Sequence, residues 1–134
     1  MAGYSSRTLV DKLGIKPRTR IAIVNPPRGY RVTLGKLPPG VIVASVPRGP
    51  LPFIQFFVKS RDVLEAKLPA LLRALESDGS LWISWPKKAS GVATDMTEDV
   101  VRAVALPIGL VDVKVAAVDE VWSGLKLVWR RENR

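Results

Sequence analysis

Two loops gather the side chains best suited to chemistry, and the first of them is rich in lysine. It spans residues 85–91 and directly follows an apolar stretch that we predict as a strand. Its two ammonium groups, its hydroxyl and its glycine backbone can together hold a phosphate or a carboxylate. The spacing differs from that of a P-loop, and the alternative interpretation is a solvated basic turn. The ligand-binding candidates in this loop are Trp85, Lys87, Lys88, Ser90 and Gly91.

The second loop is a predicted hairpin tip with two neighbouring acids and an aromatic ring. Asp119 and Glu120 can act as a base or as magnesium ligands, and Trp122 can offer a stacking surface. The alternative is that the acids are turn residues and that Trp122 packs on the sheet. Because both loops are expected at the carboxyl ends of strands, we predict one cleft between them, with Lys87 or Lys88 within about 20 Å of Asp119.

Positive charge is concentrated in the first third of the chain. The 134 residues include 21 Lys or Arg and 12 Asp or Glu, which gives a net charge of +9. Residues 1–50 hold nine of these basic residues and a single acid, Asp11, for a local charge of +8. Such a field attracts nucleic acid, phosphorylated ligands or acidic protein surfaces, and its alternative role is solubility. The candidate nucleic-acid-binding residues are Arg18, Arg20, Arg28, Arg31 and Arg48. They are not interleaved with aromatic stacking platforms.

The composition excludes several kinds of active site. The chain has no His and no Cys, which rules out a Ser-His-Asp triad, a catalytic thiolate, a zinc site and an iron–sulfur site. A metal would have oxygen ligands only, and acid–base chemistry would depend on Asp, Glu, Lys or Tyr. We predict no metal site.

The sequence shows no recognisable targeting or membrane segment. The first residues lack the apolar stretch of a secretory signal, and no run approaches the roughly 18 apolar residues that span a bilayer. The absence of Cys fits a reducing compartment. We therefore expect a cytoplasmic protein without a membrane partner.

The hydrophobic pattern predicts strands and helices in alternation. Apolar strands are expected at residues 20–25, 41–46, 53–59 and 81–85, and a leucine-rich helix is expected after Ser60. Pro69 is expected to kink that helix or to divide it into two segments, and Asp78-Gly79 is expected to be a turn. Strands at 111–118 and 125–130 should form a hairpin that turns at Ser123-Gly124. This order predicts one α/β domain over residues 1–134, with a single doubly wound, mostly parallel sheet that ends in an antiparallel hairpin.

The pattern after residue 70 resembles the C-terminal half of a methyltransferase-type Rossmann fold, with one helix–strand unit missing between Val46 and Phe53. Such folds place a glycine-rich turn after the first strand, where backbone N–H groups reach the cofactor. Here that turn reads Asn25-Pro26-Pro27-Arg28-Gly29, and its two prolines have no N–H to donate. We therefore predict no cofactor, and S-adenosylmethionine is retained only as an alternative.

Nearly the whole chain resembles the short bacterial proteins grouped as domain of unknown function 3052. The resemblance is most specific at Trp85-Pro86-Lys87-Lys88, at Ser90-Gly91, and at Asp119-Glu120 with Trp122-Ser123-Gly124. At Ala116 this sequence departs from similar proteins, which carry a cysteine there, so a thiol-dependent role is not expected here. The family has no assigned activity.

These observations favour a non-catalytic binding protein, and they leave catalysis open. Its partner would be an anionic or nucleotide-like ligand, or an acidic protein surface, at the carboxyl ends of the strands. The first alternative is sequence-tolerant nucleic-acid binding through the basic first third. The second alternative is a minimal S-adenosylmethionine-dependent methyltransferase.

Overall fold

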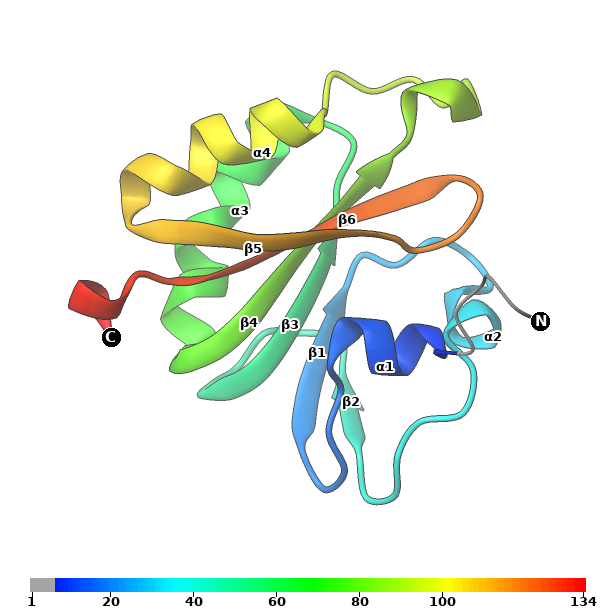
Figure 1. Cartoon of the computed structure of the whole chain (residues 1–134), viewed down its shortest axis with the longest axis vertical. Coiled ribbons are helices and arrows are strands. Elements are labelled where there is room, and N and C mark those ends of the chain that lie inside the picture. Colours follow the sequence, from blue (N-terminus) through cyan, green and yellow to red (C-terminus); the bar gives the residue numbers. More distant parts are fainter. Residues whose placement is uncertain (1–6) are drawn as a thin grey trace.

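The computed structural model describes residues 7–134, which form one six-stranded sheet with helices on both faces (Figure 1). The helices are α1 (Leu9–Leu13), α2 (Tyr30–Leu34), α3 (Arg61–Ala74) and α4 (Glu98–Ala105). The strands are β1 (Arg20–Val24), β2 (Ile42–Ala44), β3 (Leu51–Phe57), β4 (Leu75–Pro86), β5 (Leu110–Ala117) and β6 (Trp122–Trp129). Short 3₁₀ turns lie at Lys88–Ser90, Leu106–Ile108 and Arg131–Asn133.

The strand order is β2-β1-β3-β4-β6-β5, and it confirms the predicted fold class. The pairs β1–β2, β1–β3 and β3–β4 are parallel, whereas β6 is antiparallel to both β4 and β5. The chain passes from β1 to β2 on one side and then to β3 on the other side of β1. The strand order therefore reverses at the boundary between β1 and β3, which is where open α/β sheets bind ligands.

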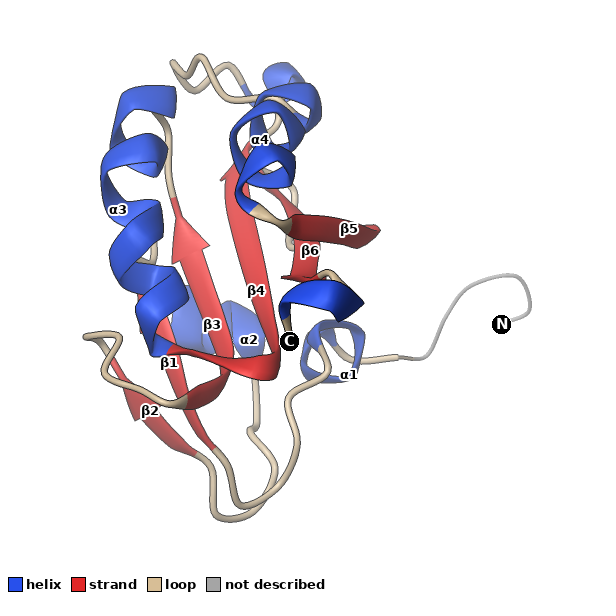
Figure 2. Ribbon diagram, turned by 90° about the vertical axis from the view of Figure 1, so that its left-hand side faces the viewer, coloured by secondary structure: helices blue, strands red, loops and turns tan. Residues whose placement is uncertain are grey.

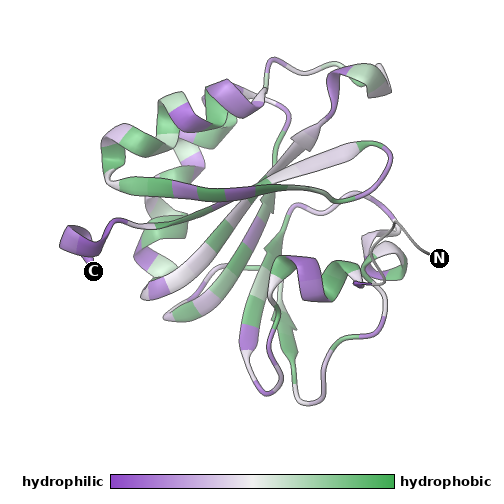
Figure 3. Ribbon diagram, viewed as in Figure 1, coloured by the Kyte–Doolittle hydropathy of each residue, from purple (hydrophilic) through white to green (hydrophobic). Residues whose placement is uncertain are grey.

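The sheet separates two apolar clusters. One face packs against α3 and α4, and its cluster contains Phe56, Leu68, Trp85 and Val101 among others. The opposite face packs against α1 and α2, and its cluster includes Leu13, Trp82 and Trp122. Figure 2 shows the two helical layers on either side of the sheet, and Figure 3 shows the apolar character of the strands between them.

Side-chain caps fix where the helices begin. Ser60 accepts a hydrogen bond from the Val63 N–H at the start of α3, and Thr97 accepts one from the Val100 N–H at the start of α4. Helix α3 continues through Pro69 as one element, and this proline lies on the exposed side of the helix. The alternative that Pro69 divides this helix into two segments is therefore wrong.

The glycines of two predicted turns, Gly79 and Gly124, both lie within strands. Gly79 lies within β4 where the pairing with β3 shifts register between Leu75 and Ser80, and a Cβ there would come within 2.9 Å of Leu75 Cδ1. Gly124 lies within β6, where a Cβ would come within 3.1 Å of Trp82 Cε3. A side chain at either position would require its neighbour to move. The hairpin instead turns at residues 118–121, between β5 and β6.

The connection from β2 to β3 contains no helix, as the missing helix–strand unit predicts. Strand β2 is only three residues long and is an edge of the sheet. Within residues 7–134, no helix is long and apolar enough to cross a bilayer.

Candidate functional site

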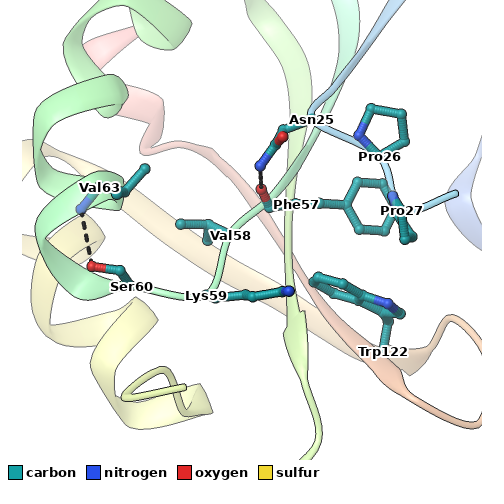
Figure 4. A pocket seen from close by; sticks show the side chains of 9 residues that line it. All are labelled: Asn25, Pro26, Pro27, Phe57, Val58, Lys59, Ser60, Val63 and Trp122. Atoms are coloured by element: carbon teal, nitrogen blue, oxygen red, sulfur yellow. Dashed lines mark hydrogen bonds between the residues drawn. The ribbon is translucent and has the colours of Figure 1, made fainter. Parts of the chain in front are cut away.

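A pocket of about 330 Å³ lies at the carboxyl ends of β1 and β3, where the strand order reverses (Figure 4). Its volume is at the lower end of the range of small-molecule sites. Three segments of the chain contribute to it: the turn after β1, the turn from β3 into α3, and the start of β6. The residues that line it are Asn25, Pro26, Pro27, Phe57, Val58, Lys59, Ser60, Val63 and Trp122.

The turn after β1 is held by Asn25. This residue adopts a left-handed backbone conformation with a φ of 58°, which asparagine tolerates better than most residues. Its side-chain amide donates a hydrogen bond of 3.0 Å to the carbonyl oxygen of Phe57 at the end of β3. The bond ties the two strand ends together and directs Pro26 and Pro27 along one side of the pocket (Figure 4).

The turn between β3 and α3 supplies a cation and a helix N-terminus. Thr94 Oγ1 donates a 2.6 Å hydrogen bond to the Lys59 carbonyl, and the Asp95 carboxylate accepts one of 2.8 Å from the Arg61 N–H. The segment before α4 therefore fixes the backbone of this turn. The Lys59 side chain remains exposed and extends towards Trp122 (Figure 4). Its ammonium group and the positive end of the α3 dipole both favour an anion here.

Aromatic rings form the inner side of the pocket. The Phe57 ring packs edge-on against Tyr30, with 4.6 Å between ring centroids, and against Trp122 at 5.1 Å. Trp122 is only 8% exposed, so it presents an edge of its indole and not a whole face. The arrangement is rigid and apolar, and it can accept the rim of a planar ring.

A buried polar chain runs beneath this aromatic cluster. The Tyr30 hydroxyl donates to Gln55 Oε1 at 2.6 Å, and Gln55 Nε2 donates to Ser84 Oγ at 3.2 Å. Burial raises the pKa of the Tyr30 phenol well above its ordinary value, and the nearby Asp119 charge adds to this effect. The hydrogen bond to Gln55 lowers the pKa of the phenol and so partly opposes the effect of burial. The phenol is therefore a structural donor and not an acid at neutral pH.

The predicted lysine loop forms a compact turn beside this pocket. The Ser90 hydroxyl donates to the Lys87 carbonyl at 2.6 Å and accepts from the Val92 N–H, so its hydrogen bonds hold the turn together. Gly91 closes the turn with a φ of 77°. Lys88 lines a separate pocket of about 260 Å³ with Thr94 and neighbouring residues.

The predicted hairpin tip lies next to this loop. The Lys87 N–H donates a 2.7 Å hydrogen bond to the Val121 carbonyl, which places the two loops side by side. Asp119 accepts hydrogen bonds of 2.8 Å from the Val121 and Trp122 N–H groups, as a turn residue does. Glu120 is exposed at the tip. Across residues 7–134, no group of three acidic side chains could hold a metal ion.

Trp85 is a correction to the predicted site. Its side chain is 5% exposed and belongs to the cluster beneath α3 and α4, whereas Trp122 belongs to the opposite cluster. Trp85 on β4 and Trp122 on β6 are offset by one residue in the strand pairing, because Trp85 pairs with Ser123 and Pro86 pairs with Trp122. Successive residues of a strand face opposite sides, so the two rings cannot line one cleft.

The five candidate arginines lie at both ends of β1 and do not form one group. Arg18 and Arg20 lie at its amino end, where Arg20 donates a 3.1 Å hydrogen bond to the Arg48 carbonyl. Arg28 and Arg31 follow the carboxyl end of β1, next to and within α2. The charge excess of the first third is therefore divided between two regions of the surface.

Sequence reasoning missed Lys59 and Ser60 as site residues. The sequence does indicate these two residues, because Lys59 and Ser60 lie at the carboxyl end of the predicted third strand. Asn25 and the two prolines were recognised as a poor cofactor turn, but not as part of a pocket wall. The contribution of Phe57 depends on strand packing, and the sequence does not indicate it.

Comparisons with known proteins support the fold. No family model matches the sequence, and no curated protein matches it. Among solved structures, a SAM-dependent methyltransferase from Aquifex aeolicus is 14% identical, with a TM-score of 0.65 over 89% of this chain and 86% of that one. A ribosomal protein L11 methylase from Lactobacillus delbrueckii subsp. bulgaricus is 11% identical, with a TM-score of 0.59 over 92% and 75%. The fibrillarin pre-rRNA processing protein of Methanococcus jannaschii is 11% identical, with a TM-score of 0.59 over 90% and 73%. At these identities the likeness defines the class of fold: a methyltransferase-type, Rossmann-like α/β protein.

The residues of this chain do not fit S-adenosylmethionine in the manner of that fold. Pro26 and Pro27 occupy the turn whose N–H groups would reach the cofactor. No carboxylate lines the described pocket, and β2 is followed by Ser45 and Val46, so an acid for the ribose hydroxyls is absent from both places. The pocket's charged side chain is Lys59, which would repel the positive sulfonium.

Proposed function

We propose that this protein is a non-catalytic binding protein that holds a small anionic, nucleotide-like ligand in the pocket at the carboxyl ends of β1 and β3. The observation that carries the proposal is the combination of Lys59, the N-terminus of α3 and the edge of Trp122 around one pocket at the reversal of strand order. The cation and the helix end favour a phosphate or a carboxylate. The apolar wall favours a ring attached to it.

Apart from Lys59, the lining of the site offers no group for acid–base or metal catalysis. Its lining offers no carboxylate, and the described chain around it offers no cluster for a metal. The Tyr30 phenol, which could serve as an acid, is buried and bonded to Gln55. Lys59 is therefore assigned to charge recognition, and Ser60 to the capping of α3.

Adenosine 5′-monophosphate and adenosine, titrated by isothermal calorimetry at low ionic strength, test this proposal. We expect the monophosphate to bind and adenosine to bind much more weakly, because the phosphate provides the charged contact. Lys59→Met should weaken monophosphate binding about tenfold or more, since a hydrogen bond to a charged group contributes about 1.5–3 kcal/mol. The matched control is Lys67→Met, which changes an exposed lysine on α3 outside this pocket and should leave the affinity unchanged.

Two results would contradict the proposal. Absence of binding by every nucleoside monophosphate at millimolar concentration would remove the ligand class, and native mass spectrometry would then search for a different co-purifying molecule. Tight binding of S-adenosylmethionine would instead favour the methyltransferase alternative over a non-catalytic role.

A further inference from the structure

A second pocket, of about 290 Å³, lies at the opposite end of the sheet from the site described above. It is formed by the loop between α1 and β1, the first residues of β3, and one side of β4 and β6. The polar residues that line it are Lys16, Thr19, Asp78, Ser80 and Lys126. This pocket therefore combines segments from the beginning, the middle and the end of the chain.

Strand register places a further lysine, Lys114, beside the pocket residue Lys126. Lys126 on β6 pairs with Trp82 on β4 and with Lys114 on β5, so these three side chains share the face covered by α1. The Lys114 ammonium lies 6.0 Å from the centroid of the Trp82 ring. Like charges directly opposite each other on neighbouring strands are destabilising, which makes this pair an unusual choice for a sheet.

The third lysine reaches this surface from a loop that is firmly docked. The Trp82 indole N–H donates a 2.9 Å hydrogen bond to the Leu13 carbonyl at the end of α1. A few residues later, the Thr19 hydroxyl donates a 2.7 Å hydrogen bond to the Lys16 carbonyl. These bonds fix the loop that carries Lys16 over the same face as Lys126.

No ion pair in the described part of the chain neutralises the positive charge of these three lysines. Ion pairs in residues 7–134 involve Arg61 and Arg102, and none involves Lys16, Lys114 or Lys126. Burial lowers the pKa of Lys126, and the charges of Lys114 and Lys16 lower it further. The nearby acid in the pocket is Asp78, which is exposed at its rim and forms no ion pair.

We propose that this surface is a second anion site, which takes a phosphate group between Lys16, Lys114 and Lys126. A phosphate offers several oxygens and up to two negative charges, so it can contact three ammonium groups at once. Ser80 and Thr19 provide hydroxyls at the same place, and the Thr19 hydroxyl oxygen can still accept a hydrogen bond. The proposal is independent of the function proposed for the carboxyl edge, because the two pockets share no residue.

Inorganic pyrophosphate is the probe for this site, and its binding is measured by isothermal calorimetry on the full chain at low ionic strength. We expect Lys126→Met to weaken pyrophosphate binding at least tenfold, because it removes the central lysine and keeps an unbranched side chain that can pack on the sheet. Lys36→Met removes the same charge from an exposed position outside both pockets and should leave the affinity within about twofold. Pyrophosphate that bound in the carboxyl-edge pocket instead would be weakened by Lys59→Met and not by Lys126→Met, so the two variants separate the two sites.

Further variants keep the test decisive. If circular dichroism shows that Lys126→Met does not fold, Lys16→Met in the loop takes its place. This variant is also expected to weaken pyrophosphate binding at least tenfold. Asp78→Asn should tighten pyrophosphate binding, because it removes the carboxylate from the rim. The proposal is overturned if the protein binds neither pyrophosphate nor an oligonucleotide. It is also overturned if Lys36→Met weakens binding as much as Lys126→Met does.

The phosphate could belong to a free phosphorylated molecule or to a nucleic-acid backbone, and an oligonucleotide of about ten residues distinguishes them. Binding of pyrophosphate that depends on Lys126 supports the site with a small phosphorylated molecule as its source. Binding of the oligonucleotide alone, again dependent on Lys126 and steeply reduced by salt, supports the site with a backbone phosphate as its source.

Discussion

At the scale of single residues, Gln55 is the most consequential polar side chain of the core. It lies in the middle of β3 and is fully buried, a position that costs free energy unless the amide is hydrogen-bonded on both sides. The Gln55 amide oxygen accepts a hydrogen bond from Tyr30, and the amide nitrogen donates one to Ser84. The chain of bonds connects α2 to the centre of the sheet and so holds the floor of the carboxyl-edge pocket in place.

The buried phenol of Tyr30 predicts a loss of stability at alkaline pH. Burial raises the pKa of Tyr30 in the folded state, whereas in the unfolded chain the phenol ionises near its ordinary value of about 10. Below that value the contribution to the free energy of unfolding is complete, and above it the contribution falls as pH rises, because only the unfolded state releases the proton. We expect the free energy of unfolding, measured in urea between pH 8 and 11, to fall above about pH 10.

Tyr30→Phe is the control for this effect. At neutral pH it should cost about 1–3 kcal/mol, because Gln55 Oε1 is left without its donor. Its free energy of unfolding should then depend less steeply on alkaline pH than that of the natural chain. Equal slopes in the two proteins would mean that Tyr30 does not titrate as proposed.

At the scale of elements, α3 shows how one apolar face attaches a helix to the sheet and positions its N-terminus. Leu64, Leu68 and Leu71 are buried against the strands, whereas Pro69 faces outward. The loss of one N–H at Pro69 therefore does not interrupt the buried face. The same packing sets where Ser60 and Lys59 enter the pocket at the start of the helix.

Leu68→Ala should destabilise the protein by about 2–5 kcal/mol, because it leaves a cavity at a side chain that is only 1% exposed. Leu72→Ala, the same substitution at a half-buried position on this helix, should cost clearly less. Urea denaturation followed by circular dichroism measures both. Similar costs for the two variants would show that α3 does not pack on the sheet through the described face.

At the scale of the whole molecule, two apolar clusters share one sheet. The strands β1, β3, β4 and β6 contribute side chains to both, alternating from one face to the other. Because the two clusters share these strands, unfolding of the strands on one face would also expose the apolar side chains on the other face. The 134 residues are therefore expected to unfold as one cooperative unit, in line with the single domain that the sequence predicts.

Thermal unfolding should give a single transition, with equal calorimetric and van't Hoff enthalpies. Leu34→Ala on the α2 side and Leu71→Ala on the α3 side should each lower the midpoint of that same transition, because both side chains are buried. Differential scanning calorimetry and near-ultraviolet circular dichroism provide the measurements. A second transition that only one of the variants moves would instead divide the chain into two folding units.

Much of the fold could be predicted because it depends on local patterns. Continuous apolar runs defined β1 and β3, and the spacing of Leu64, Leu68 and Leu71 defined α3. The glycines were misread for a physical reason. Gly79 and Gly124 resemble turn residues in sequence, but their function is to leave space for Leu75 and Trp82, and those neighbours are known only once the strands are paired. Trp85 was misplaced for the same reason, because its face depends on register.

The sequence by itself determined the class of fold, the unsuitable turn at Pro26-Pro27 and the absence of thiol and imidazole chemistry, since each follows from residue types and local spacing. Only the tertiary structure decided where charge and pockets coincide. The basic residues of the first third lie at two ends of the sheet. Lys59 and Trp122 line one pocket at the first end, and Lys16 and Lys126 line another pocket at the second end. The physical reason is that strand order and register bring distant residues together, and these depend on how the whole chain packs its two apolar faces.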